Sequence, residues 1–172
     1  MRKERIRFAG KVASHDEAVT AVQRQPGDAA LVVRGTVRLL ILNCPCGCGD
    51  YLTINLDSRV GPAWRFYLRK NALTLFPSYW RDSHCESHFI LWSNRIYWCD
   101  RDDWWPDEVS AGLRQSVLEI LPSEFTRYDI VAEKIGEIPW DVLDVCRALT
   151  REGKAERHPD KRRRDEFRRI ST

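Results

Sequence analysis

The stretch LLILNCPCGCG occupies residues 39–49 and decides the structure of the region around it. It begins with the apolar run of a buried strand and ends with three cysteines within five residues. Glycine allows the tight turns that aim several thiolates at one point, and zinc in proteins prefers such sulfur ligands. The stretch therefore predicts a strand that runs directly into a zinc-binding turn.

Tetrahedral zinc needs four ligands, and Cys85 is the obvious distant fourth. His84 or His88 could replace one of the clustered cysteines, and a turn of reduced, solvent-facing thiols without metal is the alternative. A set rich in thiolates forms a closed structural site rather than an open catalytic one. We therefore expect a structural zinc ion. Its expected ligands are Cys44, Cys46, Cys48 and Cys85.

Apolar and polar residues alternate on both sides of the cysteine turn, as they do in half-buried strands. A capping box at Ser14–Glu17 begins one short helix, which Val22 continues. Ser93 and Asn94 form a plausible tight hairpin turn. The predicted strands span residues 5–11, 30–34, 36–42, 51–57, 64–69, 73–76, 88–92 and 95–99.

From Val109 onward the apolar period changes from two residues to 3.6, which indicates helices. Three helices are expected, followed by a basic closing hairpin, which is the order of a winged helix. They are expected around residues 113–121, 130–135 and 139–149, with hairpin strands at 154–158 and 166–170. The predicted fold class is α+β: a zinc-clipped, β-rich domain (residues 1–105) followed by a small three-helix winged-helix domain (residues 106–172), with the boundary near 103–110.

The charge pattern limits the function classes. The chain has 172 residues and a formal net charge of only +3, so it lacks the global basic field of a protein that coats nucleic acid. A local patch remains, because nine basic and five acidic residues lie within 151–172, including the run at 161–164. No apolar run is long enough for a membrane helix, and the N-terminus has no apolar signal segment. We therefore expect a cytoplasmic protein that does not bind membranes, in which six cysteines indicate metal or redox chemistry before disulfides.

Residues 77–89 place serines and histidines around Cys85. A serine nucleophile needs a histidine base within hydrogen-bonding reach. Neighbours in a strand point to opposite faces, so His88 should pair with a distant serine such as Ser78 rather than with Ser87, unless the chain turns sharply at Cys85. Ser87 would then share a face with Cys85 and support the metal. The alternative is that Ser87 and His88 both only support the zinc site.

Two carboxylates, Glu86 and Asp57, are candidates for orienting the histidine. Other conspicuous residues are expected to be packing residues. These are Cys99, Trp104, Trp105, Trp140 and Cys146.

Four motifs of this sequence resemble those of a bacterial family that is encoded beside ubiquitin-like proteins with E1-like and E2-like enzymes. The motifs are the cysteine turn, the Asn-Leu-Asp that ends at Asp57, the Leu-Phe-Pro-Ser that ends at Ser78, and the Cys-Glu-Ser-His-Phe at 85–89. The resemblance covers roughly residues 5–100. It implies a zinc-containing, serine-type, deubiquitinase-like peptidase that trims a ubiquitin-like precursor or removes it from targets. The matching positions are Cys44, Cys46, Cys48 and Cys85 for metal, and Ser78, Ser87 and His88 for chemistry. The winged helix departs from this family pattern.

Two other functions stay open. The chain could be a non-enzymatic zinc-binding adaptor that recruits DNA or a protein through its winged helix. The basic wing suits phosphate contacts, whereas Asp141, Asp144 and Glu152 of the third helix would face an anionic groove, which favours protein docking. A zinc hydrolase with His84 or His88 in the metal shell is the third hypothesis.

Overall fold

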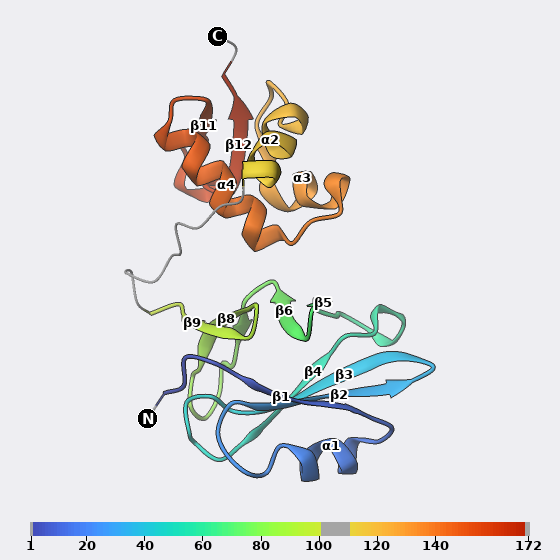
Figure 1. Cartoon of the computed structure of the whole chain (residues 1–172). Helices are drawn as coiled ribbons and strands as arrows, with labels where there is room; N and C mark the ends of the chain where they lie inside the picture. Colours follow the sequence, from blue (N-terminus) through green and yellow to red (C-terminus); the bar gives the residue numbers. More distant parts are fainter. Residues whose placement is uncertain (1, 101–110, 171–172) are drawn as a thin grey trace. The chain divides into compact units, whose positions relative to one another are not determined.

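The computed structural model describes residues 2–100 and 111–170, and the chain forms two compact units, residues 1–104 (unit 1) and 105–172 (unit 2) (Figure 1). The boundary expected near 103–110, together with Trp104 and Trp105, lies outside the described residues. In the described ranges, no helix has the length and apolar character that crossing a membrane requires.

The described part of unit 1 contains three small sheets and one α-helix, α1 (His15–Ala21). The sheet orders are β1-β2-β3-β4, β5-β6 and β7-β8-β9. The pairing of β1 with β2 is parallel, and the other pairings are antiparallel. The predicted strands are confirmed, but the parallel pairing and the short β7 were not predicted. The strands are β1 (Arg7–Val12), β2 (Asp28–Arg34), β3 (Thr36–Asn43), β4 (Tyr51–Asn55), β5 (Arg65–Arg69), β6 (Ala72–Phe76), β7 (Tyr79–Trp80), β8 (His88–Trp92) and β9 (Arg95–Trp98), with a 3-10 turn η1 at Ser58–Val60.

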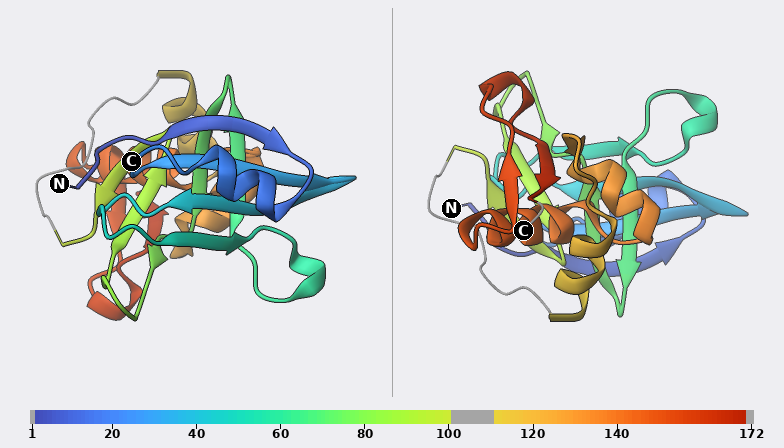
Figure 2. Two further views of the ribbon diagram at one scale, coloured as in Figure 1. Left: turned by 90° about the horizontal axis from the view of Figure 1, so that it is seen from below. Right: turned by 90° about the horizontal axis from the view of Figure 1, so that it is seen from above.

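In the first sheet, β2 and the second half of β3 are buried on both faces, which explains their continuous apolar runs. Ala30 and Val32 of β2 pack with α1, whereas Ala29 and Leu31 face the core shared with β6, β8 and β9. Side chains alternate across a strand, so one apolar run supplies both cores. Figure 1 shows α1 on one side of this sheet and β5–β9 on the other, and the view from below in Figure 2 shows α1 in front of the sheet.

The predicted capping box at the start of α1 is present in a modified form. The Ser14 hydroxyl accepts a hydrogen bond from the Glu17 amide at 3.2 Å. The Glu17 carboxylate accepts one from the amide of Ala13 at 3.0 Å, one residue before the usual partner. Both bonds satisfy amides that an uncapped helix would leave without partners, which is worth about 1 kcal/mol per cap.

The turn between β8 and β9 holds three segments together. Ser93 and Asn94 have φ values of 49° and 63°, as the predicted tight hairpin requires. The Asn94 amide donates to the carbonyl of Leu73, and its side-chain oxygen accepts from the Leu73 amide at 2.7 Å. The carbonyl of Asn94 also accepts from the amide of Ile6. The turn therefore ties β8 and β9 to β6 and to the segment before β1.

The described part of unit 2 contains the three predicted helices and the predicted closing hairpin. A further strand, β10, was not predicted and extends the hairpin to a sheet of order β10-β12-β11. The elements are α2 (Ala111–Ile120), β10 (Thr126–Arg127), α3 (Tyr128–Ile135), α4 (Pro139–Arg151), β11 (Ala155–Arg157), the 3-10 turn η2 (Lys161–Arg163) and β12 (Glu166–Arg169).

Burial in unit 2 confirms two packing predictions and overturns one expectation. Trp140 and Cys146 are buried, as expected. Asp144 was expected to face an anionic groove, but it is only 1% exposed and does not face outward. Its place in the helical period puts it among the apolar residues of α4, which sequence reasoning by charge alone overlooked.

Candidate functional site

The turn after β3 gathers three cysteines because its glycines adopt conformations that other residues rarely reach. Gly47 and Gly49 have φ values of +86° and +92°. The Cys44 amide donates to the carbonyl of Asp50 at 2.8 Å, and the Gly47 amide donates to the carbonyl of Cys44 at 3.1 Å. These bonds close the turn and aim its thiols toward one side.

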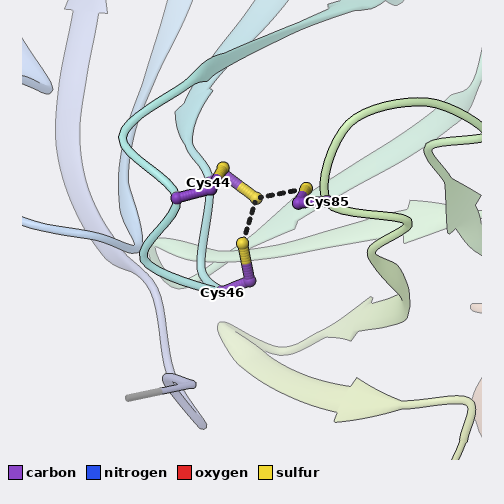
Figure 3. Close-up of side chains that lie close together, drawn as sticks. Cys44, Cys46 and Cys85 are labelled. Carbon is purple, nitrogen blue, oxygen red and sulfur yellow. Dashed lines mark hydrogen bonds between the residues drawn. The ribbon is translucent and has the colours of Figure 1, made fainter.

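The fourth cysteine reaches this turn from a distant segment. Cys85 lies in the loop between β7 and β8, and its sulfur is 3.8 Å from that of Cys44, which is itself 3.3 Å from that of Cys46 (Figure 3). The sulfurs of Cys44, Cys46, Cys48 and Cys85 all lie within 4.8 Å of one another. Four sulfurs around tetrahedral zinc, at bond lengths of about 2.3 Å, would be separated by about 3.8 Å. The four side chains are therefore close enough to bind one metal ion such as zinc.

An ion pair fastens the Cys85 loop to the cysteine turn. The guanidinium of Arg81 lies 2.8 Å from the carboxylate of Asp50, and His84 Nδ1 lies 3.5 Å from the same carboxylate. The Arg81 amide also donates to the carbonyl of Ser87 at 2.9 Å, which closes the loop on itself. Asp50 and Arg81 were not predicted as site residues, because nothing in the sequence links an aspartate at 50 to an arginine at 81.

Ser87 lies against the sulfurs, as expected. Its hydroxyl oxygen is 3.2 Å from the Cys85 sulfur and 3.5 Å from the Cys44 sulfur, and the residue is only 2% exposed. A hydroxyl in this position can support a thiolate by hydrogen bonding. A hydroxyl this deeply buried is not accessible to a substrate.

The thiols of the cluster have different acidities. Burial raises the pKa of Cys44, and the hydroxyl of Ser87 partly opposes this effect. Burial would also raise the pKa of Cys85, but hydrogen bonds from the hydroxyl and the amide of Ser87, together with those from Cys46 and Cys48, outweigh it and lower the pKa to about 6. Cys85 is therefore ready to act as a thiolate ligand at neutral pH.

The structure brings Ser78 and His88 together on the neighbouring sheet. His88 Nε2 lies 3.2 Å from the Ser78 hydroxyl oxygen, which confirms the predicted pairing of His88 with a distant serine. Ser78 follows the end of β6 and stands just before β7, whose Trp80 pairs with His88 of β8. Both residues are partly exposed, so the pair is open to a substrate.

Neither predicted orienting carboxylate contacts this pair. The oxygens of Asp57 accept hydrogen bonds from Arg38 and Arg59, so this carboxylate is engaged elsewhere. Glu86 is exposed, and within the described ranges it has no hydrogen bond to His88. Its φ value of 49° turns the chain at this residue, so that the alternation of side chains along a strand does not apply there.

Three further side chains stand outside the cysteine cluster. His88 is hydrogen-bonded to Ser78, and His84 contacts the carboxylate of Asp50. Neither histidine therefore replaces a cysteine in the group of four. Cys99 is half-buried and also lies outside the group. Burial, followed by the nearby Asp100 carboxylate, raises the pKa of the Cys99 thiol to about 11.

Comparison with known proteins identifies the region that carries these residues. Curated proteins and solved structures give no match to the chain. A protein-family model described as the bacterial ubiquitination-like system serine protease (BubE) matches residues 15–99, which include the four cysteines, Ser78 and His88. Residues 15–99, which make up most of unit 1, are therefore similar to the BubE family of bacterial ubiquitination-like system serine proteases.

Proposed function

We propose that unit 1 is a serine peptidase that cleaves a bacterial ubiquitin-like protein, with Ser78 as nucleophile and His88 as general base. The observation that carries the proposal is the 3.2 Å approach of His88 Nε2 to the Ser78 hydroxyl on an accessible surface. Ser87 is the competing nucleophile. Its burial against two sulfurs gives it the supporting role instead.

The chemistry follows from this pair. His88 Nε2 takes the hydroxyl proton as Ser78 Oγ attacks the carbonyl carbon of the scissile bond. His88 then donates this proton to the leaving amine, and an acyl group remains on Ser78. Water releases the acyl group by the same steps, with His88 again as base. For this role the neutral imidazole must carry its proton on Nδ1.

The proposed zinc ion is structural, and its ligands are the four clustered cysteines. A closed thiolate site of this kind supplies folding free energy and no catalytic water. It joins the turn after β3 to the loop that leads into β8. In this way it fixes the segment that contains His88, three residues beyond Cys85.

The proposed substrates are a ubiquitin-like precursor and conjugates of the mature ubiquitin-like protein. The family name places relatives of unit 1 in a bacterial ubiquitination-like system. The proposed partners are therefore this ubiquitin-like protein and the E1-like and E2-like proteins that act on it. We place this chemistry in the cytoplasm, where such conjugation would take place.

A fluorophosphonate probe tests the proposal without knowledge of the substrate. An activated serine displaces fluoride from phosphorus and forms an Oγ–P bond, while the hydroxyl proton passes to the histidine. We expect mass spectrometry to find the label on Ser78, and we expect the label to disappear in His88→Ala. Labelling of Ser87 instead, or unchanged labelling in His88→Ala, would overturn the assignment.

A second candidate function belongs to unit 2, for which we propose a winged-helix architecture and an adaptor role. The order of its three helices and the antiparallel pair β11–β12 supports this architecture. The turn η2 projects a run of four exposed basic residues and is closed by the Asp160 carboxylate, which accepts from the Arg162 amide. Such a loop suits phosphate groups of DNA, or an acidic protein.

A titration with a fluorescent DNA duplex separates these two partners. Affinity that falls steeply with salt, and that is lost in a variant with residues 161–164 changed to alanine, supports DNA binding. Undetectable binding at low salt leaves protein docking as the role of unit 2.

A further inference from the structure

The outer edge of β7 carries an exposed aromatic residue next to the proposed catalytic pair. Trp80 is 65% exposed, unlike Trp92 and Trp98, which are at most 9% exposed. Its ring centroid lies 6.1 Å from that of His88. Trp80 and Ser78 are two residues apart in extended chain, so both lie on the face toward which His88 points. The exposed indole therefore adjoins the reacting atoms.

The hydrogen-bond register gives the direction of the main-chain groups of Trp80. The Arg81 amide donates to the carbonyl of Ser87, so these two residues form a hydrogen-bonded pair of the antiparallel ladder. The next pair, Trp80 with His88, must then be a pair without mutual hydrogen bonds. Consistent with this, the carbonyl of His88 turns to the other side and accepts from the amide of Cys99. The amide and carbonyl of Trp80 therefore point away from β8.

These two groups face an edge that no further strand covers in the described ranges. β7 is the outermost strand in the order β7-β8-β9. Within the part of the chain that the structure describes, neither the amide nor the carbonyl of Trp80 has a hydrogen-bonding partner. Two residues earlier, the Ser78 carbonyl on the same edge accepts from the indole nitrogen of Trp64 at 3.3 Å. On this edge, the main-chain carbonyl of Ser78 is thus already hydrogen-bonded, whereas the amide and carbonyl of Trp80 are available for a new strand.

We propose that the Trp80 edge of β7 is a substrate-binding subsite for an extended peptide segment, which adds as a strand next to β7. The main chain of the segment pairs with the amide and carbonyl of Trp80, and the indole covers it. Strand addition of this kind obtains affinity from the main chain and specificity from side chains beside it. Because Trp64 closes the edge at Ser78, the added strand ends where the nucleophile stands, which places a peptide bond at Ser78 Oγ. The inference rests on the proposed function and names the form in which that site takes its substrate.

Hydrogen–deuterium exchange on the full chain carrying Ser78→Ala tests this subsite without catalysis. The probe is a ubiquitin-like protein from a bacterial ubiquitination-like system, compared with the same protein lacking its C-terminal tail. We expect the Trp80 amide to exchange at least tenfold more slowly in the complex, and only when the tail is present. If the tail-dependent protection falls elsewhere, or is absent, the inference is overturned. The proposed function survives that result if the fluorophosphonate still labels Ser78 in the unmodified chain.

Two substitutions separate the main-chain contact from the indole. Trp80→Pro removes the outward amide but no bond to β8, because proline is tolerated where the amide faces away from the sheet. We expect it to weaken binding of the tailed protein at least tenfold and Trp80→Ala to weaken it severalfold. Val60→Ala, at an apolar residue that is 72% exposed and lies outside β7, is the control and should bind normally. Equal affinity of all three variants would contradict the subsite.

Discussion

The guanidinium of Arg81 lies 2.8 Å from the carboxylate of Asp50, and this ion pair joins the two segments that supply the clustered cysteines. The side chains of Arg81 and Asp50 are 21% and 37% exposed, so solvent weakens their attraction without removing it. The pair holds the cysteine turn against the Cys85 loop, and it does so without need of a metal ion.

Replacing Asp50 by asparagine should therefore loosen the metal centre without unfolding unit 1. We expect the free energy of unfolding to fall by about 1 kcal/mol or less, since the pair is partly exposed. The metal should also pass to a chelator severalfold faster, which a colorimetric zinc indicator measures. Glu166→Gln, which removes the Arg163–Glu166 pair of unit 2, is the matched control and should leave the release rate unchanged.

Loss of one clustered cysteine should abolish metal binding. We expect about one zinc ion per chain by elemental analysis, and none in Cys85→Ser, with a large drop in the melting temperature of unit 1 because metal binding contributes folding free energy. Cys99→Ser changes a cysteine outside the cluster and should keep the metal. Absence of zinc from the unmodified protein, or its retention in Cys85→Ser, would refute the four-cysteine site.

Removal of the proposed base should abolish cleavage but not metal binding. In His88→Ala we expect the rate of cleavage of a ubiquitin-like precursor to fall on the order of 10³-fold, because Ser78 loses its proton acceptor. The zinc content should stay the same. His84→Ala is the control, since His84 lies at Asp50 rather than at Ser78, and it should cleave at a near-normal rate. Loss of zinc in His88→Ala would show that His88 is a ligand.

Because of the Asp57 carboxylate, the free energy of unfolding of unit 1 should fall as the pH becomes acidic. Hydrogen bonds from Arg59, opposed by burial and reinforced by Arg38, hold the pKa of Asp57 well below its usual value. A carboxylate whose pKa is depressed by folding stabilises the protein above the unfolded pKa of about 3.9, and this contribution is lost as the pH falls further. We expect Asp57→Asn to destabilise the protein clearly at pH 6 and progressively less below about pH 4.

Urea unfolding of both proteins at several pH values measures this difference. Asp16→Asn, at a fully exposed carboxylate, should show no such dependence. A stability difference that is constant from pH 6 to pH 2.5 would contradict the role of the Arg38–Asp57–Arg59 cluster.

Much of this structure could be predicted from periodicity and turn chemistry. Local sequence signals are preserved in the structure, because they depend only on residues that are close in sequence. They include the apolar runs in β2 and β3, the cap at Ser14 and the turn at Ser93 and Asn94. The pairing of His88 with Ser78 rather than Ser87 could also be predicted, because strand alternation is a strict geometric rule.

What the sequence could not provide is the partner of each element in space. The parallel pairing of β1 with β2 depends on how α1 packs, and the pairing of Arg81 with Asp50 depends on how the loops close. The expectation that Asp57 could orient His88 was wrong, because the Asp57 carboxylate accepts hydrogen bonds from Arg38 and Arg59 instead. Trp80 could have been noticed, since its two-residue spacing from Ser78 places both on one face, but its free edge depends on the sheet order.

The turn at Asn94 has a consequence for how this sequence can vary. Its φ value of 63° is one that glycine adopts most easily, so the backbone alone would accept glycine there. The amide side chain, however, accepts from the Leu73 amide and donates to the carbonyl of Asn71, and glycine can do neither. Aspartate would keep the first bond and lose the second. Relatives that preserve this junction of three segments should therefore retain asparagine at this position, even where the neighbouring strands have diverged.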